Sequence, residues 1–424
     1  MKLVVGEKTY TKLHGLKFDP VADVTGNEVP INEFSVDVIT EDNIDAMQYA
    51  WLYDDTDKLW AKYWIVYADK ADKNTVTVKA QSSLKLLERR MLDAHMYTNE
   101  PAPSVIADIF DELGADSYIL DESFDGATLT GFVPYQSCKT RLQWVCFVLG
   151  AYIKSFFNEV IEILPVGVTD KIVPREKVYW KPNLVYGEYR TRISVTAYSY
   201  EQGTPGNTDT WVKDAEGVTY IQSQLNHGMR NPDVPDGALT HEEHFTDITL
   251  VNDGNVDEIL TRLGPSYFRR LSAEVDVINN GEYLPGERVA VYTDSTHVVD
   301  GFIEKADFSF GLQAAAQMTI TPAVSVECAP LTVIYKYGNT EISRAEYYWP
   351  IDYPFDIENP WFDVTWLGTR YIFKPLQASI TGVMTQEGET IVQEYTPALE
   401  YRDGDLYIIS VDDFSTEGGT VRVI

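Results

Sequence analysis

The chain has 424 residues and a mass of 48.0 kDa, more than one hydrophobic core usually organises, so we expect three or four domains. Its hydrophobic fraction of 44% is that of a folded protein, and its 27 Tyr, 17 Phe and 9 Trp favour strands over helices. The 34 Lys and Arg against 65 Asp and Glu give a net charge of -31, which argues against the basic surface that stable binding of DNA or RNA requires.

The first ninety residues or so are predicted to be strands followed by a short helix. Apolar and polar residues alternate in 33–40 (EFSVDVIT) and 74–80 (NTVTVKA), which indicates strands with one buried face. The stretch 60–69 (WAKYWIVYAD) is apolar on both faces, as expected for a strand between two packed layers or one that faces a neighbouring subunit. Helical spacing of leucines in 82–92 then ends a first β-domain, residues 1–93.

The Pro-rich stretch TNEPAPS, residues 98–104, marks a change to helical periodicity. Ser104 is placed to cap a helix through VIADIFDEL, whose apolar residues share one stripe. Gly114 follows directly and is typical of a helix end. A first helix is therefore predicted over residues 105–113.

A second helix and a hairpin follow. Ser137 is placed to cap CKTRLQWVCFVL, and Gly150 ends it. The strands AYIKSFF and EVIEIL then meet near Asn158 as a hairpin. We therefore predict a compact α+β module over residues 94–165.

Strands resume in TRISVTAYSY and lead into a long polar excursion, residues 201–244, whose Gly, Pro, Asn and Asp predict loops or a flap. Asn255 is predicted to begin a helix that Gly264 and Pro265 stop. Further strands are expected in RRLSAEVDVI, RVAVYTD, VVDGFIEKADFSF and QAAAQMTITP. Residues 166–325 thus form a second β-domain with a helix and a long loop.

The last hundred residues, 326–424, contain short strands with regular turn signals and are predicted to form a small sandwich-like β-domain. This part is unusually aromatic. Aromatic platforms bind sugars or protein partners, and they equally well form the core of a domain. The residues that we expect to contact a partner or a glycan are Tyr348, Trp349, Tyr353, Trp361 and Trp366.

Cysteine usage and the N-terminus indicate the compartment of synthesis. Cys138, Cys146 and Cys328 fit neither a disulfide framework nor a zinc-ligand spacing, which is typical of a reducing compartment. MKLVVGEKTY lacks the apolar region of a signal peptide, and the longest apolar run, WVCFVLGAYI, is well below the roughly 20 residues of a membrane span. We expect cytosolic synthesis and no membrane span.

No constellation in the sequence predicts a catalytic, cofactor or metal site. His241 and His244 flank two glutamates, but the spacing is not that of a zinc helix and no third ligand is evident. Acidic runs such as 54–57 resemble solvated turns more than glycosidase carboxylate pairs. Cys146 lies on an apolar helix stripe and is predicted to be a core thiol, and phosphate-binding loops and nucleophile elbows are absent. The chain is therefore predicted not to be an enzyme.

Three stretches, in this order, resemble the hub family of bacteriophage tails, large trimeric baseplate proteins also found in prophages and tail-like bacteriocins. INEFSVDVIT followed by YAWLYDDTDKLWAKYWIVYAD resembles the family's first barrel. PSVIADIFDELG through GFVPYQSCKTRLQWVCFVLGAYI resembles its inserted α+β domain. NVDEILTRL with RRLSAEVDVI, YLPGERVAVYT and HVVDGFIEKADFSF resembles its second barrel. Together they cover most of residues 1–325.

This resemblance implies a mainly β fold with an α+β insertion. Residues 1–93 are expected to form a first tube-like antiparallel β-barrel, and 94–165 the inserted α+β domain. A second tube-like barrel with a helix and a long loop is expected over 166–325. A β-rich, sandwich-like accessory domain is expected over 326–424.

The resemblance also implies the partners. A homotrimer would place two barrels per chain in a pseudo-sixfold ring, which joins the tail tube or distal tail protein to a spike or central fibre protein and meets a tape-measure protein. DNA would pass transiently through an acidic lumen without stable binding, although the acid surplus is also explained by solubility alone. The expected location is the baseplate or tail tip of a virion, after synthesis in the bacterial cytoplasm.

Two other functions stay open at this point. The chain could be a tail-tip or surface component that binds host glycans through its aromatic C-terminal domain. It could also be a cell-wall or glycan hydrolase, although it lacks the motifs of the hydrolase domain that some hubs carry after their barrels.

Overall fold

The computed structural model describes the backbone of residues 1–424 except 168, 169, 174–176, 189, 236, 293–296, 311–313, 338, 339, 351–361, 367, 368, 377, 378, 387, 388, 396, 397, 403, 404, 411–418 and 424, and side chains up to residue 325 except at those positions and at 170, 172 and 297. The chain divides into two compact units, Met1–Ala290 with Asp300–Val324 and Val291–Val299 with Ser325–Ile424. Strands make up 49% of it and helices 16%, which confirms the predicted mainly β fold.

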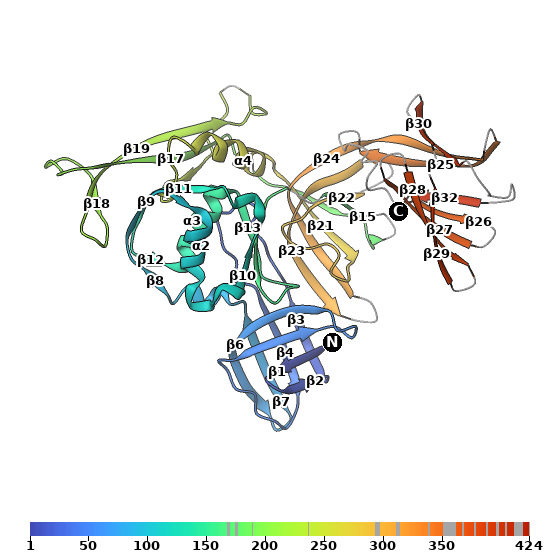
Figure 1. Cartoon of the computed structure of the whole chain (residues 1–424), viewed down its shortest axis with the longest axis horizontal. Coiled ribbons are helices and arrows are strands. Elements are labelled where there is room, and N and C mark those ends of the chain that lie inside the picture. The colour runs from blue at the N-terminus through green and yellow to red at the C-terminus, as the bar shows by residue number, and fades with distance from the viewer. Residues whose placement is uncertain are drawn as a thin grey trace. The chain divides into compact units, whose positions relative to one another are not determined.

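Seven antiparallel strands at the N-terminus form a strongly curled sheet, coloured blue in Figure 1. They pair in the order β3-β4-β7-β6-β5-β1-β2. Along β4 and β7 the predicted alternation is confirmed, because Val36 and Val78 are buried between polar neighbours that are half-buried or exposed. The strands are β1 (Lys2–Val5), β2 (Lys8–Tyr10), β3 (Leu13–Phe18), β4 (Glu33–Ile39), β5 (Tyr49–Tyr53), β6 (Leu59–Asp72) and β7 (Thr75–Gln81).

The long strand β6 is the corner of this curled sheet. Its first half pairs with β5 and its second half with β7, and the register shifts between Ile65 and Tyr67. Trp60 and Tyr63 are buried, whereas Val66 and Tyr67 are exposed. Within this chain, the strand predicted to be apolar on both faces is therefore fully packed on one face only.

The next segment combines helices with short strands, and α2 packs on α3 within it. β13 and β14 form the predicted antiparallel hairpin, and β10 adds to β14 in parallel. β9 pairs with β11, and β8 pairs with β12. The elements are α1 (Leu84–Leu87), β8 (Met91–Leu92), β9 (His95–Pro101), α2 (Ala102–Phe110), the 3-10 turns η1 (Asp111–Leu113), η2 (Ala115–Ser117) and η3 (Glu122–Phe124), β10 (Tyr118–Leu120), β11 (Thr128–Val133), β12 (Gln136–Ser137), α3 (Cys138–Leu149), β13 (Ala151–Lys154) and β14 (Ile161–Pro165).

The ends of α3 are those that the sequence predicts. The Ser137 hydroxyl accepts a hydrogen bond from the Thr140 backbone N–H at 3.1 Å. At the other end Gly150 takes a left-handed conformation, with φ 69°, and its N–H donates to the Cys146 carbonyl.

The predicted start of α2 is wrong. The helix begins at Ala102 after Pro101, so Ser104 lies inside the first turn and does not cap it. Pro103 explains the difference, because its fixed φ and missing N–H suit the first turn of a helix. A 3-10 turn then leads to Gly114, which has φ 88°.

A second set of strands continues the first sheet. The path runs β16-β21-β24-β23-β3, and β22 joins β23 to β15. The two strand sets meet where Phe308 on β23 lies opposite Phe18 on β3. The strands are β15 (Asp170–Val173), β16 (Asn183–Tyr186), β21 (Leu271–Ile278), β22 (Arg288–Tyr292), β23 (His297–Phe310) and β24 (Ala314–Tyr337).

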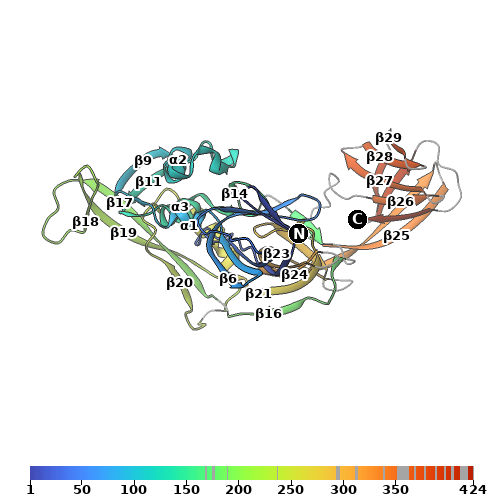
Figure 2. The ribbon, with the colours of Figure 1, turned by 90° about the horizontal axis from the view of Figure 1, so that it is seen from below.

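A long hairpin occupies much of the segment that was predicted as loops or a flap. β17 (Arg192–Gln202) and β19 (Thr219–Arg230) pair over their whole length, β18 (Trp211–Lys213) adds to β19, and β20 (Glu242–Phe245) runs parallel to the start of β17 (Figure 2). Residues 201–244 are therefore partly strand. Their polar composition misled the prediction because a solvent-exposed ladder needs backbone hydrogen bonds, not apolar side chains.

Helix α4 (Val256–Phe268) packs on β17 and β19. The expected stop at Gly264 and Pro265 is wrong, since the helix continues through both. Pro265 removes one backbone hydrogen bond from the last turn, and the packing of α4 on β17 and β19 compensates for this loss. Gly264 lets the helix approach the hairpin, because a Cβ there would lie 3.1 Å from the Met229 sulfur. The apolar side of α4 shares one core with the α+β module.

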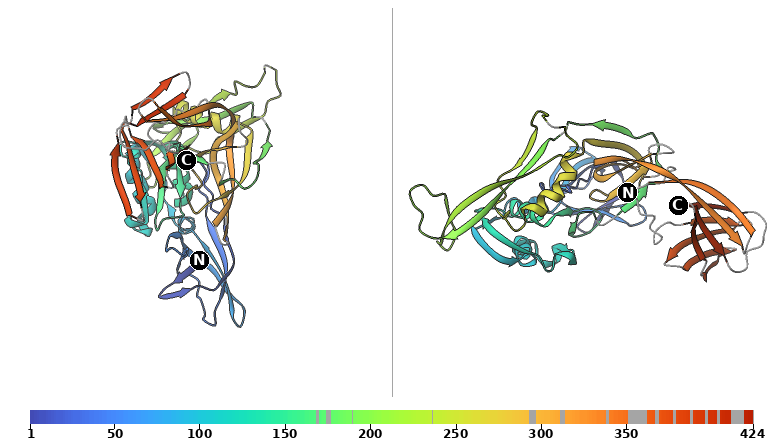
Figure 3. Two further views of the ribbon diagram at one scale, coloured as in Figure 1. Left: turned by 90° about the vertical axis from the view of Figure 1, so that its right-hand side faces the viewer. Right: turned by 90° about the horizontal axis from the view of Figure 1, so that it is seen from above.

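The second unit consists of strands in the described part of the chain. β26 to β29 and β32 form a five-stranded sheet, β32-β26-β27-β28-β29, seen in red in Figure 3. β24 pairs with β25 and β31 beyond residue 327, and β31 pairs with β30. The strands are β25 (Thr340–Pro350), β26 (Phe362–Trp366), β27 (Thr369–Leu376), β28 (Ser379–Gln386), β29 (Glu389–Tyr395), β30 (Ala398–Arg402), β31 (Asp405–Ser410) and β32 (Gly419–Val423).

Candidate functional site

The junction of the two strand sets is built from aromatic side chains. Phe18 and Phe308 stack with ring centroids 6.0 Å apart, and Trp60 packs edge-on against Phe308 at 4.8 Å. Phe157, from the hairpin loop of the α+β module, lies 4.6 Å from Trp60. Lys58 covers the Phe157 ring at 5.2 Å. The buried face of the joined sheet is therefore held by side chains from both strand sets and from the inserted module.

The opposite face of the joined sheet is polar and open to solvent. On β4 and β7 most residues of this face are polar, such as Asp37, whose carboxylate accepts a hydrogen bond from Thr77 at 2.7 Å. On β21 the same face carries Glu274 and Asp276, between buried neighbours. The charged residues on the solvent side of β3, β4, β7, β21 and β23 include Lys17, Glu33, Asp37, Lys79, Glu274, Asp276, Lys305 and Asp307.

Acidic groups outnumber basic ones among these residues, and one carboxyl group beside them responds to this surplus. Burial, and then the nearby Asp307, raise the pKa of Asp19, which lies beside the junction. Lys305 forms an ion pair with Asp307 and offsets part of this repulsion. A face of this kind attracts no polyanion strongly, because its net charge has the same sign as phosphate.

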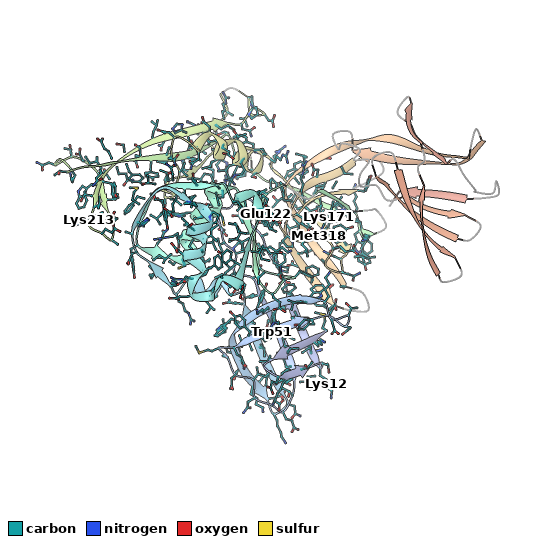
Figure 4. The ribbon with its side chains drawn as sticks, viewed as in Figure 1. Lys12, Trp51, Glu122, Lys171, Lys213 and Met318 are labelled. Atoms are coloured by element: carbon teal, nitrogen blue, oxygen red, sulfur yellow. The ribbon has the colours of Figure 1, made fainter. Side chains whose placement is uncertain are left out.

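The outer side of β5 and β6 carries aromatic rings around one lysine. Tyr49 packs edge-on against Trp64 with ring centroids 5.1 Å apart and lies beside Trp51 at 6.2 Å. Lys62 is 5.6 Å from the Tyr49 ring and 6.0 Å from the Trp51 ring, and 3.7 Å from Glu159 of the module. Figure 4 labels Trp51, which lies on β5. The rings are half-buried, as expected at the rim of an interface more than in a core.

His241 and His244 do not converge on a common metal site. His241 directly precedes β20 and His244 lies within it, so their odd spacing directs them to opposite faces. His244 Nδ1 is 2.6 Å from the Ser194 hydroxyl, whereas His241 contacts Arg190. Across the described residues, no three His, Cys, Asp or Glu side chains gather as metal ligands.

Cys146 is a core thiol, as predicted. It is buried, and burial raises its pKa to about 12. None of the helices in the described ranges combines enough length with enough apolarity to span a bilayer.

Three of the five aromatic residues predicted to form a contact surface lie on described strands of the second unit. Tyr348 and Trp349 are consecutive in β25, opposite Pro330 and Ala329 of β24. Trp366 ends β26, opposite Thr369. Tyr353 and Trp361 lie outside the described residues. Their role as a contact surface stays a prediction.

Sequence reasoning missed the residues that join the two strand sets. The Phe308 segment was predicted as a strand, but no local pattern shows that it pairs with β3 nearly three hundred residues earlier. The alternation along β4, β7 and β21 did predict which residues face solvent. What it could not show is that these faces belong to one sheet.

No protein-family model and no curated protein matches this chain. Its fold is nevertheless found in solved structures. A tail protein from Neisseria meningitidis MC58 has a TM-score of 0.50 at 9% identity, over 76% of this chain and 95% of that one. The 43 kDa tail protein of prophage MuSo2 from Shewanella oneidensis has a TM-score of 0.50 at 10% identity, over 76% and 97%. Prophage tail protein gp18 from Listeria monocytogenes EGD-e has 0.49 at 12% identity, over 76% and 94%.

The chain has the fold of phage-derived tail proteins. The resemblance read from its sequence is thereby confirmed at the level of fold, because both structures with a TM-score of 0.50 are almost completely covered. Because only about a tenth of the residues are identical, this similarity establishes the fold alone.

Proposed function

We propose that the protein is a structural hub of a phage-type tail, in which three copies place their two strand sets around one axis as a pseudo-sixfold ring. In this ring the hub joins the tail tube or distal tail protein to a spike or central fibre, next to the tape-measure protein. It has no catalytic role in this proposal.

One observation carries the proposal: two antiparallel strand sets in one chain share a sheet through Phe18 and Phe308. A sheet that is packed on one face and polar on the other supplies a continuous curved wall. Repeated by three chains, such walls close into a tube, and closure removes exposed sheet edges. The fold that the chain shares with tail proteins supports the same proposal.

The test is the assembly state of the purified full-length chain. Light scattering after size exclusion should give three times the chain mass of 48.0 kDa, and negative-stain images should show rings. The trimer should also bind a tail-tube protein on one side. A chain that stays monomeric at high concentration and forms no ring overturns the proposal.

The polar face of the joined sheet is proposed to line the lumen and to let DNA pass. Reversal of three of its acids, Glu33→Lys, Glu274→Lys and Asp276→Lys, should make the assembly retain double-stranded DNA, and added salt should release it. The matched control reverses three exposed acids of the α+β module, Asp116→Lys, Glu122→Lys and Asp125→Lys. Equal DNA retention by both variants would contradict the lumen assignment.

The aromatic residues of the second unit are proposed to contact another tail component or a host glycan. Trp349→Ala and Trp361→Ala should each reduce binding in a glycan array or in pull-downs with tail proteins. Trp211→Ala is the control, because Trp211 is an exposed tryptophan of the first unit. Binding that falls equally in all three variants would count against this surface.

A further inference from the structure

The outer edge of β19, on the side away from β17, is open beyond the short strand β18 (Figure 2). β18 pairs with residues 219–221 of this edge, and the Gln222 N–H donates to the Thr210 carbonyl at 2.8 Å just beyond them. Residues 223–229 pair with β17 on one side and have no neighbouring strand on the other among the described strands. Most of these residues are exposed, so they form a solvated strand edge.

Two hydrogen bonds fix which backbone groups of β19 point outward. Gln222 donates toward β18, whereas Asn231, directly after β19, donates toward β17, to the Thr191 carbonyl at 3.0 Å. Between them the register with β17 runs without a shift. In an antiparallel ladder the backbone groups of successive residues alternate between the two sides. The groups that point away from β17 are therefore those of Gln224, Asn226 and Gly228.

The side chains of this edge do not protect it against pairing with another strand. Residues 219–229 contain no Lys, Arg, Asp, Glu or Pro. Natural proteins protect their edge strands with such residues, or keep these strands very short. β2, at one end of the joined sheet, is protected in both ways, because it has three residues and carries Lys8, which pairs with Asp42. The edge of β19 is therefore suited to the addition of a strand.

The side chains along the edge define the kind of strand that fits. Leu225 is 60% exposed on one face of β19, and Gln224 and Asn226 lie on the other face. An added strand places one side chain beside Leu225 and its two neighbours beside the amides, so an apolar residue between two small polar ones fits best. A charged residue in this strand would find no charged side chain on residues 222–229 with which to pair.

We propose that the open edge of β19, residues 223–229, takes up an extended, uncharged segment of another polypeptide as an added strand in line with β18. β18 pairs with the same edge in antiparallel orientation, so the edge already accepts a strand from its own chain. In strand addition the backbone hydrogen bonds supply affinity, and alternate side chains supply selectivity. The inference concerns a single copy of the chain and does not depend on the proposed ring.

A second copy of this chain is a less suitable occupant. Two copies of a chain with a net charge of -31 repel each other, and residues 219–229 offer no charge of opposite sign to offset this repulsion. An uncharged segment of another polypeptide meets no such barrier.

The experiment measures the binding of a peptide to the full-length chain. The probe is a fluorescein-labelled peptide of residues 193–200, ISVTAYSY, the uncharged part of the strand that pairs with β19 on its other side. It alternates apolar residues with hydroxyl residues, as the edge requires. Fluorescence anisotropy should show saturable binding, and hydrogen exchange measured by mass spectrometry should show slower exchange in residues 223–229 when the peptide is bound.

Two substitutions at Gln224 isolate the contribution of the outward backbone. Gln224→Pro removes the outward N–H but leaves the bonds to β17 in place, a position where an edge strand tolerates proline. It should weaken peptide binding about tenfold, because the added strand loses a hydrogen bond and meets the proline ring. Gln224→Ala is the matched control, because it shortens the same side chain and keeps the N–H, and it should bind the peptide like the parent chain.

A third variant tests the edge without changing its backbone groups. Leu225→Lys places a charge beside the added strand, which is the protection that natural edges use, and it should weaken binding about threefold. If Gln224→Pro does not fold by circular dichroism, this variant decides, and a parental affinity of Leu225→Lys then overturns the proposal.

The outcomes separate this inference from the proposed function. Equal affinities of folded Gln224→Pro and Gln224→Ala overturn the proposal, as does a parent chain that binds no peptide or is protected outside residues 223–229. If the chain alone forms dimers that Gln224→Pro dissociates in light scattering, a second copy occupies the edge and the proposed occupant is wrong. A chain that stays monomeric and binds the peptide overturns the ring and supports this inference.

Discussion

The α+β module and the first strand set use apolar residues in different ways. In the module, the helices α2 and α3 turn their apolar stripes toward each other and toward α4, and Ile106, Leu142 and Leu263 are completely buried in one cluster. In the first strand set, β6 buries Trp60 and leaves Val66 and Tyr67 in solvent. The module is completed by its own chain, whereas the strand set presents apolar surface that another chain can cover.

The largest effect is expected where the two regions meet. Trp60 is 1% exposed and touches Phe157 of the module and Phe308 of the second strand set. Trp60→Ala should reduce the free energy of unfolding of the strand sets by about 3–5 kcal/mol, because it leaves a large cavity.

Hydrogen exchange measured by mass spectrometry locates this loss. Amides of β3, β6 and β23 should lose protection, while those of α2 and α3 keep it. Equal loss of protection in α2 and α3 would show that the stability of the module depends on the strand sets.

A second variant probes how the module is joined to the segment before α4. Gly131 in β11 has φ 143°, and a Cβ there would lie 2.5 Å from the Thr249 carbonyl oxygen. Gly131→Ala should cost about 1–3 kcal/mol in urea denaturation, because backbone strain and a clash with backbone act together. Gly126→Ala is the control, since a Cβ at Gly126 meets nothing within 4 Å. Similar losses in both variants would contradict the close approach.

The same two regions show what the sequence could predict. In the module, local signals decide the structure: Ser137 and Gly150 fix both ends of α3, and the hairpin of β13 and β14 follows from apolar runs around a polar turn. In the strand sets, alternation predicted the buried face of β4 and β7. These features depend on neighbours within a few residues, which a sequence displays directly.

The features that the sequence did not predict share one physical cause, which is that they depend on residues far away along the chain. The β17–β19 ladder is stabilised by backbone hydrogen bonds that its polar composition hides. Helix α4 continues through Pro265 because packing against the hairpin compensates for one lost bond. The union of the two strand sets rests on Phe18 and Phe308, whose pairing no local pattern encodes.

A third pair of variants separates a real helix cap from a predicted one. Ser137→Ala should lower the free energy of unfolding of the module by about 1 kcal/mol, because Thr140 loses the acceptor of its backbone N–H. Ser104→Ala should change it little, since Ser104 lies inside α2, where alanine is the better helix former. Thermal unfolding of both variants checks this, and a larger loss at Ser104 would restore the helix start predicted from sequence.

The smallest effect concerns the charges that tie α1 to α3. Glu88 accepts from Lys85 at 2.5 Å and from Lys139 at 3.1 Å, and the bond from Lys85, helped by Lys139 and opposed by partial burial, holds the pKa of Glu88 below its ordinary value of 4.5. A lowered carboxyl pKa stabilises the fold above pH 4.5, and this contribution is lost as the pH falls through the lowered value. Glu88→Gln should therefore cost a few tenths of a kcal/mol at pH 7 and nothing in strong acid, because the side chains are partly exposed and screened. Denaturation of this variant and of the control Glu122→Gln, measured at pH 7 and pH 3, checks the sign. If the loss at Glu88 is as large at pH 3 as at pH 7, the carboxylate charge is not its source and α1 is held to the module by packing alone.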